Sequence, residues 1–158
     1  MNTNEKSATS KSPALKLEQI LVPIDFSPAS EPALEYALAL ARQFEAKLTL
    51  IHVVEPVVSS VDPSSGYMPV DIRPLEDASA KQLEKIGAER VPTVSLETTL
   101  VRTGVPFQEI TAAAKELKMD LIVITTHGYT GLAHVLLGST AERIVRHAGC
   151  PVLTVRSR

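Results

Sequence analysis

Short apolar runs recur along the chain at spacings that suit buried strands. The run from Gln19 to Ile24 is short and apolar and contains a proline near its end, which is typical of a strand buried on both faces. A weaker alternation of apolar and polar positions begins at Val94 and also favours a strand. The predicted strands are residues 19–24, 47–54, 94–100, 120–124 and 151–155.

The segments between these runs carry apolar residues at helical spacing. Ser30 is the predicted N-cap of the first helix, because Pro32 then lies in the first turn, where a missing N–H is harmless. Pro106 suits the first position of a later helix, and Ser139 to Glu142 has capping-box spacing. The predicted helices run from Ser30 to Phe44, over 75–88, from Pro106 to Leu117 and from Ser139 to about Ala148.

Strands that alternate with helices and are apolar on both faces indicate a parallel sheet covered by helices on both faces. The predicted fold class is α/β, with a single doubly wound domain. In such sheets a ligand binds beyond the carboxyl ends of the strands, at the point where the strand order reverses. The carboxyl-end edge of the predicted sheet is therefore the first place to inspect.

Composition narrows the function. A chain of 158 residues with 44% hydrophobic content suits one domain. The formal net charge of -2 and the 4% of aromatic residues argue against a nucleic-acid or anionic-membrane partner. No apolar run approaches the roughly 18 residues of a membrane span. The only cysteine, Cys150, has no internal partner and suits a reducing compartment, so we expect a cytoplasmic protein.

Two segments fall outside the predicted helices and strands. Residues 1–16 are polar and are predicted to form a flexible N-terminal tail, which leaves 17–158 as the folded domain. The stretch from Pro56 to Pro74 contains four of the 11 prolines and is predicted to be a long loop. Such loops are commonly lids or disordered segments, and the sequence leaves that choice open.

Glycines gather after the fourth predicted strand. Four of the seven lie between Gly128 and Gly149, and Gly138 and Ser139 stand at a predicted helix start. Glycine lets the backbone approach a ligand closely, and a helix start offers free N–H groups to an anion. The segment fits either a phosphate site or a tight turn capped by Ser139. No Walker or G-x-G-x-x-G pattern occurs, so a nucleotide site here must be of another type.

Several segments together resemble the universal stress protein family. They are ILVPIDFS at 20–27, LIHV at 50–53, GVP at 104–106, His127-Gly128 through Gly138-Ser139, and CPVLTV at 150–155. The resemblance spans about residues 17 to 157. It implies a five-stranded parallel sheet in the order 3-2-1-4-5 and a homodimer formed through the C-terminal strand, Pro151 to Val155.

The nucleotide-binding branch of that family has the pattern G-x-x-G, nine residues, then G-[ST], which aligns here from Thr125 to Ser139. The resemblance implies that Asp25 accepts hydrogen bonds from ribose hydroxyls and that Val53 contacts adenine. It also implies that ATP, or ADP or AMP, binds with Mg²⁺ or Mn²⁺ held through the phosphates alone. The implied nucleotide-binding residues are Pro23, Ile24, Asp25, Val53, Ile124, Thr125, Gly128, Gly138, Ser139 and Thr140.

One position departs from this pattern, because Thr125 stands where glycine is expected. Its β-branched side chain would narrow the pocket or change the local backbone angle. Three functions stay open: an ATP-binding, dimeric sensor or adaptor in the stress response, a family member that acts only through protein contacts, and a slow ATP hydrolase. The sequence offers no pairing of base and nucleophile and no Walker lysine, so binding without efficient turnover is predicted.

The remaining candidate groups have simpler interpretations. Taken alone, Asp25 after a strand favours an Asx-turn with its own backbone. The four histidines show no ligand spacing, so no protein-held metal and no catalytic residue is predicted. Cys150 is expected to be a structural thiol.

Overall fold

The computed structural model describes residues 16–56, 71–93, 95–126 and 138–156. Five strands form one parallel sheet in the order β3-β2-β1-β4-β5, as predicted. The strands are β1 Gln19–Pro23, β2 Lys47–Val54, β3 Leu96–Thr103, β4 Leu121–Thr125 and β5 Val152–Val155. The helices are α1 Glu31–Phe44, α2 Arg73–Arg90, α3 Pro106–Glu116 and α4 Ser139–His147, with a short 3-10 turn, η1, at Pro28–Ser30.

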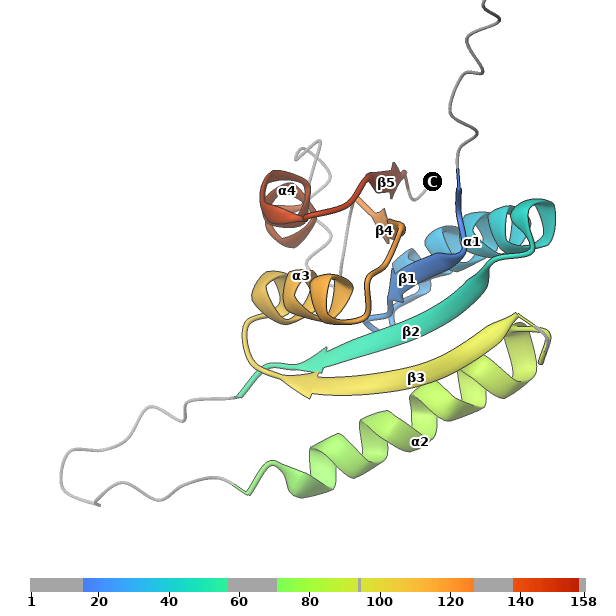
Figure 1. Cartoon of the computed structure of the whole chain (residues 1–158). Helices are drawn as coiled ribbons and strands as arrows, with labels where there is room; N and C mark the ends of the chain where they lie inside the picture. Colours follow the sequence, from blue (N-terminus) through green and yellow to red (C-terminus); the bar gives the residue numbers. More distant parts are fainter. Residues whose placement is uncertain (1–15, 57–70, 94, 127–137, 157–158) are drawn as a thin grey trace, which may run out of the picture.

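Helices cover both faces of the sheet. The core on one face joins α1 and α2 residues such as Leu34 and Leu83 to Leu48 and Leu50 of β2. The core on the other face joins Ile110 of α3 and Ile144 of α4 to strand residues such as Leu21, Ile51 and Ile122. Figure 1 shows α2 and α3 on opposite sides of β2 and β3. In β1, β2 and β4, successive residues therefore point into opposite cores, which is why these runs are apolar throughout.

Several predicted boundaries shift. The third strand begins at Leu96 and continues to Thr103, and Val94 lies outside the described residues. Pro74, which the sequence assigned to the loop, lies in the first turn of α2, where proline is tolerated. Most of that predicted loop and nearly all of the predicted tail also lie outside the described residues. Within the described ranges, no helix combines the length and apolarity that a membrane crossing needs.

Of the two predicted serine caps, Ser30 holds its position and Ser139 does not. Ser30 does occupy the N-cap position of α1, but its hydroxyl donates to the Ser27 carbonyl at 2.8 Å, because η1 precedes the helix. The capping box at Ser139 is wrong. Gly138 is the N-cap of α4, and its carbonyl accepts the Glu142 N–H at 2.9 Å, so the helix begins one residue earlier than a Ser139 cap requires.

A buried hydroxyl in β2 leads to a stability prediction. Thr49 is 1% exposed, and its Oγ1 has no hydrogen-bond partner among the described residues. Valine has nearly the same shape without the unpaired polar atom and suits a strand. We expect Thr49→Val to raise the free energy of unfolding by about 1 kcal/mol, measured by urea denaturation at unchanged m-value. Destabilisation would show that the hydroxyl has a partner in solution.

Candidate functional site

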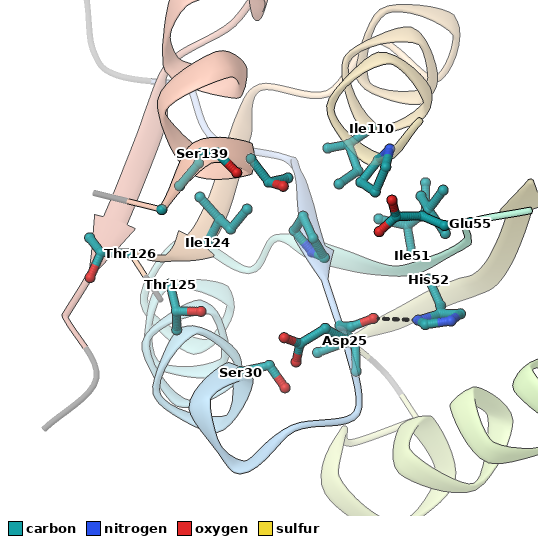
Figure 2. A pocket seen from close by; sticks show the side chains of 17 residues that line it. Asp25, Ser30, Ile51, His52, Glu55, Ile110, Ile124, Thr125, Thr126 and Ser139 are labelled. Carbon is teal, nitrogen blue, oxygen red and sulfur yellow. Dashed lines mark hydrogen bonds between the residues drawn. The ribbon is translucent and has the colours of Figure 1, made fainter. Parts of the chain in front are cut away.

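A pocket of about 470 Å³ lies at the carboxyl ends of the central strands, and the first residues of α3 and α4 also line it (Figure 2). Its volume falls in the range of about 300 to 1,000 Å³ that is usual for small-molecule sites. It sits between β1 and β4, where the strand order reverses, which is the position that the family resemblance implied. Its lining residues are Pro23, Ile24, Asp25, Ser30, Ile51, His52, Val53, Glu55, Pro106, Ile110, Ile124, Thr125, Thr126, Gly138, Ser139, Thr140 and Ala141.

The pocket brings together every residue predicted for the nucleotide site except Gly128, which lies outside the described residues. It also contains residues that sequence reasoning passed over, notably Ser30, His52, Glu55 and Ile110. Position gives a signal for two of them: His52 neighbours the predicted contact Val53, and Glu55 directly follows β2. Ser30 and Ile110 lie on other elements and reach the pocket only through tertiary packing.

Asp25 follows the end of β1 and forms the predicted Asx-turn. Its Oδ1 accepts hydrogen bonds from the Ser27 backbone N–H at 3.0 Å and from the Ser27 hydroxyl at 2.6 Å. Oδ2 has no partner among the described residues. Since a carboxylate accepts several hydrogen bonds, the turn leaves Asp25 with capacity to bind a ligand. The turn and the ligand role are therefore compatible, although the sequence analysis had set them against each other.

The backbone after Asp25 is strained. Phe26 has φ 62°, in the left-handed region that a bulky side chain rarely adopts. Such a conformation costs about 1 to 3 kcal/mol and persists where the surroundings fix it. The Phe26 ring packs against the core and against His52, with ring centroids 4.1 Å apart. The tertiary structure therefore fixes the direction of the chain at Asp25.

The start of α4 lies across the pocket from Asp25. The Gly138 N–H donates to the Thr126 carbonyl at 2.5 Å, which ties the helix start to the end of β4. Ser139, Thr140 and Ala141 form the first turn and line the pocket. First-turn N–H groups have no acceptor within their own helix, and together with the helix dipole they favour an anion. This end of the pocket suits a phosphate.

Thr125 lies between these two groups in Figure 2, on the pocket wall. It is 8% exposed, and as the last residue of β4 it pairs with Val155. Its φ is not among the positive values of the described residues, so the position requires no glycine. The side chain lines the pocket, and the predicted narrowing of the site stays a prediction.

The pocket is acidic. Asp25 and Glu55 line it, and none of its described lining residues is lysine or arginine. No cluster of three or more histidine, cysteine or acidic side chains suited to a metal occurs within the described ranges.

Cys150 is not among the residues that line the pocket, and it is half-buried against the core under α3 and α4. Burial raises the pKa of the Cys150 thiol, and the nearby negative charge of Asp120 raises it further. Both effects favour the neutral thiol over the reactive thiolate.

Comparisons with known proteins agree with this architecture. A universal stress protein of Methanocaldococcus jannaschii is 36% identical over 141 residues, which are 88% of this chain and 82% of that protein. The solved structure of another protein from that organism, MJ0577, has a TM-score of 0.75 at 26% identity and covers 90% of this chain and 98% of its own.

Two more distant structures show the same fold. A universal stress protein in complex with cAMP has a TM-score of 0.63 at 23% identity, with 89% of this chain and 98% of that chain covered. A family protein from Arabidopsis thaliana with AMP bound has a TM-score of 0.60 at 21% identity, with 89% and 92% covered. The model of the universal stress protein family matches residues 16–156. The chain belongs to the universal stress protein family.

Proposed function

We propose that this protein binds an adenine nucleotide in the pocket and acts as a dimeric sensor or adaptor in the stress response. The observation that carries the proposal is the convergence of the Asp25 carboxylate and the first turn of α4 on one cavity. A carboxylate suits ribose hydroxyls, and a helix start suits phosphates. Two structures of this fold hold adenine nucleotides, which shows that the fold accommodates such ligands.

The orientation of the nucleotide follows from these two groups. Phosphates at Gly138, Ser139 and Thr140 and ribose at Asp25 place the base toward the end of β2. There Val53, Ile51 and Ile110 provide apolar surface for the base. Gly128, which the sequence pattern also assigns to the phosphates, is included in the proposal.

A divalent ion is part of the proposed ligand. The pocket presents two carboxylates and no lining lysine or arginine among its described residues, so ATP would enter an unfavourable field on its own. Mg²⁺ or Mn²⁺ bridging the phosphate oxygens offsets that repulsion, and Mg²⁺ is commonly bound through substrate phosphates. We expect affinity for ATP to fall when the ion is chelated, and to fall less for AMP.

The same composition favours binding over turnover. Phosphoryl transfer uses positive groups to stabilise charge in the transition state, and the described lining supplies none from lysine or arginine. Slow ATP hydrolysis is the second candidate, since Asp25 and His52 both line the pocket and either side chain is of a type that orients water. We propose a cytoplasmic binding protein without efficient turnover.

One experiment tests the ligand directly. The chain has no tryptophan and three tyrosines, so a retained nucleotide would dominate its absorbance near 260 nm. Protein purified without chelator should release an adenine nucleotide on acid treatment, identified by chromatography. ATP with Mg²⁺ should also raise the melting temperature. Absence of both results would remove the nucleotide proposal and leave action through protein contacts.

Thr125→Gly tests the departure from the family pattern. Removing the side chain enlarges the pocket between Asp25 and the start of α4, so we expect MgATP to bind about five times more tightly, a change of about 1 kcal/mol. The fold should lose about 1 kcal/mol, because glycine weakens a strand end. Isothermal titration calorimetry and thermal unfolding measure the two effects.

Two conservative variants separate bulk from chemistry at this position. Thr125→Ser keeps the hydroxyl and removes the methyl group, whereas Thr125→Val keeps the bulk and removes the hydroxyl. If the glycine and valine variants both bind MgATP more weakly than the native protein, the hydroxyl contacts the ligand and does not obstruct it.

A further inference from the structure

His52 of β2 contacts the residues on both sides of Asp25. Its Nδ1 lies 2.7 Å from the backbone oxygen of Ile24, shown by the dashed line in Figure 2. Its ring stacks on Phe26, with centroids 4.1 Å apart and planes inclined at 32°. Because a carbonyl oxygen only accepts, Nδ1 must carry a proton and donate it. One imidazole therefore fastens the residue before Asp25 and the residue after it.

Both contacts of His52 are made to residues that lie beyond the paired part of β1. The paired register of β1 ends at Pro23, and the Ile24 N–H makes a last bond to the Ile51 carbonyl at 2.8 Å. The Ile24 carbonyl lies beyond that register and is taken by His52. Phe26 then adopts the left-handed conformation, which persists only where neighbours impose it. The stacked imidazole is one of those neighbours.

We propose that His52 is a positioning residue for the nucleotide site and acts through Asp25, an inference that rests on the proposed nucleotide function. By fixing Ile24 and Phe26, His52 sets the direction in which the Asp25 side chain leaves the backbone. Ser27 then holds Oδ1 and leaves Oδ2 for ribose. In Figure 2 the Asp25 carboxylate turns toward Thr125, away from His52. The imidazole thus lies on the opposite side of the backbone from the carboxylate and orients it without contacting the ligand.

Two substitutions divide the roles of His52. His52→Asn retains an N–H donor near the Nδ1 position and loses the ring. His52→Phe retains the stacking surface for Phe26 and loses the donor. Both variants keep a side chain at a half-buried position, and their far-ultraviolet circular dichroism should match that of the native protein.

The binding test compares MgATP with its 2′,3′-dideoxy analogue, since only the former offers the ribose hydroxyls. In the native protein the ratio of the two affinities should be large, and Asp25→Ala should bring it close to one. His52→Phe should weaken MgATP binding about tenfold, the effect of one lost hydrogen bond, and should lower the ratio. His52→Asn should restore most of the ratio. The double variant His52→Phe/Asp25→Ala should bind no more weakly than Asp25→Ala alone.

A second measurement needs no nucleotide. The Ser27 amide donates to Asp25, so its hydrogen-exchange protection reports the orientation of the carboxylate. Protection should fall in His52→Phe and persist in His52→Asn. Native protein that binds no nucleotide would defeat the proposed function, and this measurement would then decide the positioning role alone. Unchanged Ser27 protection in His52→Phe would overturn the inference. So would an unchanged ribose ratio, or losses that simply add in the double variant, which would indicate direct contact of His52 with the ligand.

Discussion

Asp25→Ala should reduce affinity for MgATP by about 100-fold, because two hydrogen bonds from ribose hydroxyls to a charged acceptor are lost. The carboxylate lines the pocket with Oδ2 unpaired among the described residues, so its removal acts directly on the ligand. Asp25 is only half-buried, and the fold should lose little beyond the Asx-turn. Calorimetric titration with MgATP and urea unfolding of the same preparation measure the two effects separately.

Asp25→Asn is the matched control. The amide oxygen still accepts the two hydrogen bonds from Ser27, so the turn and the Phe26 conformation should persist. The charge is lost, and one acceptor oxygen becomes a donor nitrogen, so affinity should fall about tenfold. If Asp25→Asn binds as tightly as the native protein, Asp25 acts through the turn alone and the ribose role is wrong.

The fold was predictable from the sequence because its signals are local and redundant. The apolar run from Gln19 to Ile24 and the run from Lys47 to Val54 each match an observed strand within one residue. Their two-sided burial leaves a continuous apolar pattern that little else produces. The strand order came from the family resemblance instead, since each strand's pattern is compatible with several neighbours. The cap predicted at Ser139 failed because the extended Gly138 takes that position, whereas Ser30 is the N-cap of α1 as predicted but bonds the preceding 3-10 turn through its hydroxyl.

Some residues of the candidate site were also indicated in advance, whereas others became apparent only in the structure. The glycine and serine at a helix start indicated the first turn of α4, whereas the family resemblance indicated Asp25, and both line the pocket. His52 and Ser30 were missed as site residues, because a histidine in an apolar strand and a serine before a helix have common structural explanations. The strain at Phe26 left no trace in the sequence, since left-handed backbone at a bulky residue is imposed by tertiary contacts. The sequence thus indicates candidate binding groups, whereas the structure shows the contacts that surround them.

Thr154→Pro should convert the proposed dimer to a monomer while leaving the domain folded. The carbonyls of Pro151 and Val155 accept hydrogen bonds from Ile122 and Thr126, so these residues face β4. By the period-two alternation of a strand, the N–H and carbonyl of Val152 and Thr154 face the other way. Since β5 is the last strand of the described sheet, those groups lie at its open edge. We propose that a second copy pairs there.

The loss of dimer affinity should be large, because in a symmetric dimer each substitution occurs twice at the interface. Proline removes the outward donor of both copies and places its ring where the partner strand would lie, so the dimer dissociation constant should rise by at least about 100-fold. Thr154→Ala is the control, since it keeps the N–H and should remain a dimer. Light scattering after size exclusion gives the mass, and thermal unfolding confirms the fold. A proline variant that stays dimeric would show that the interface lies elsewhere. The edge of β5 would then need another feature that prevents pairing with other chains.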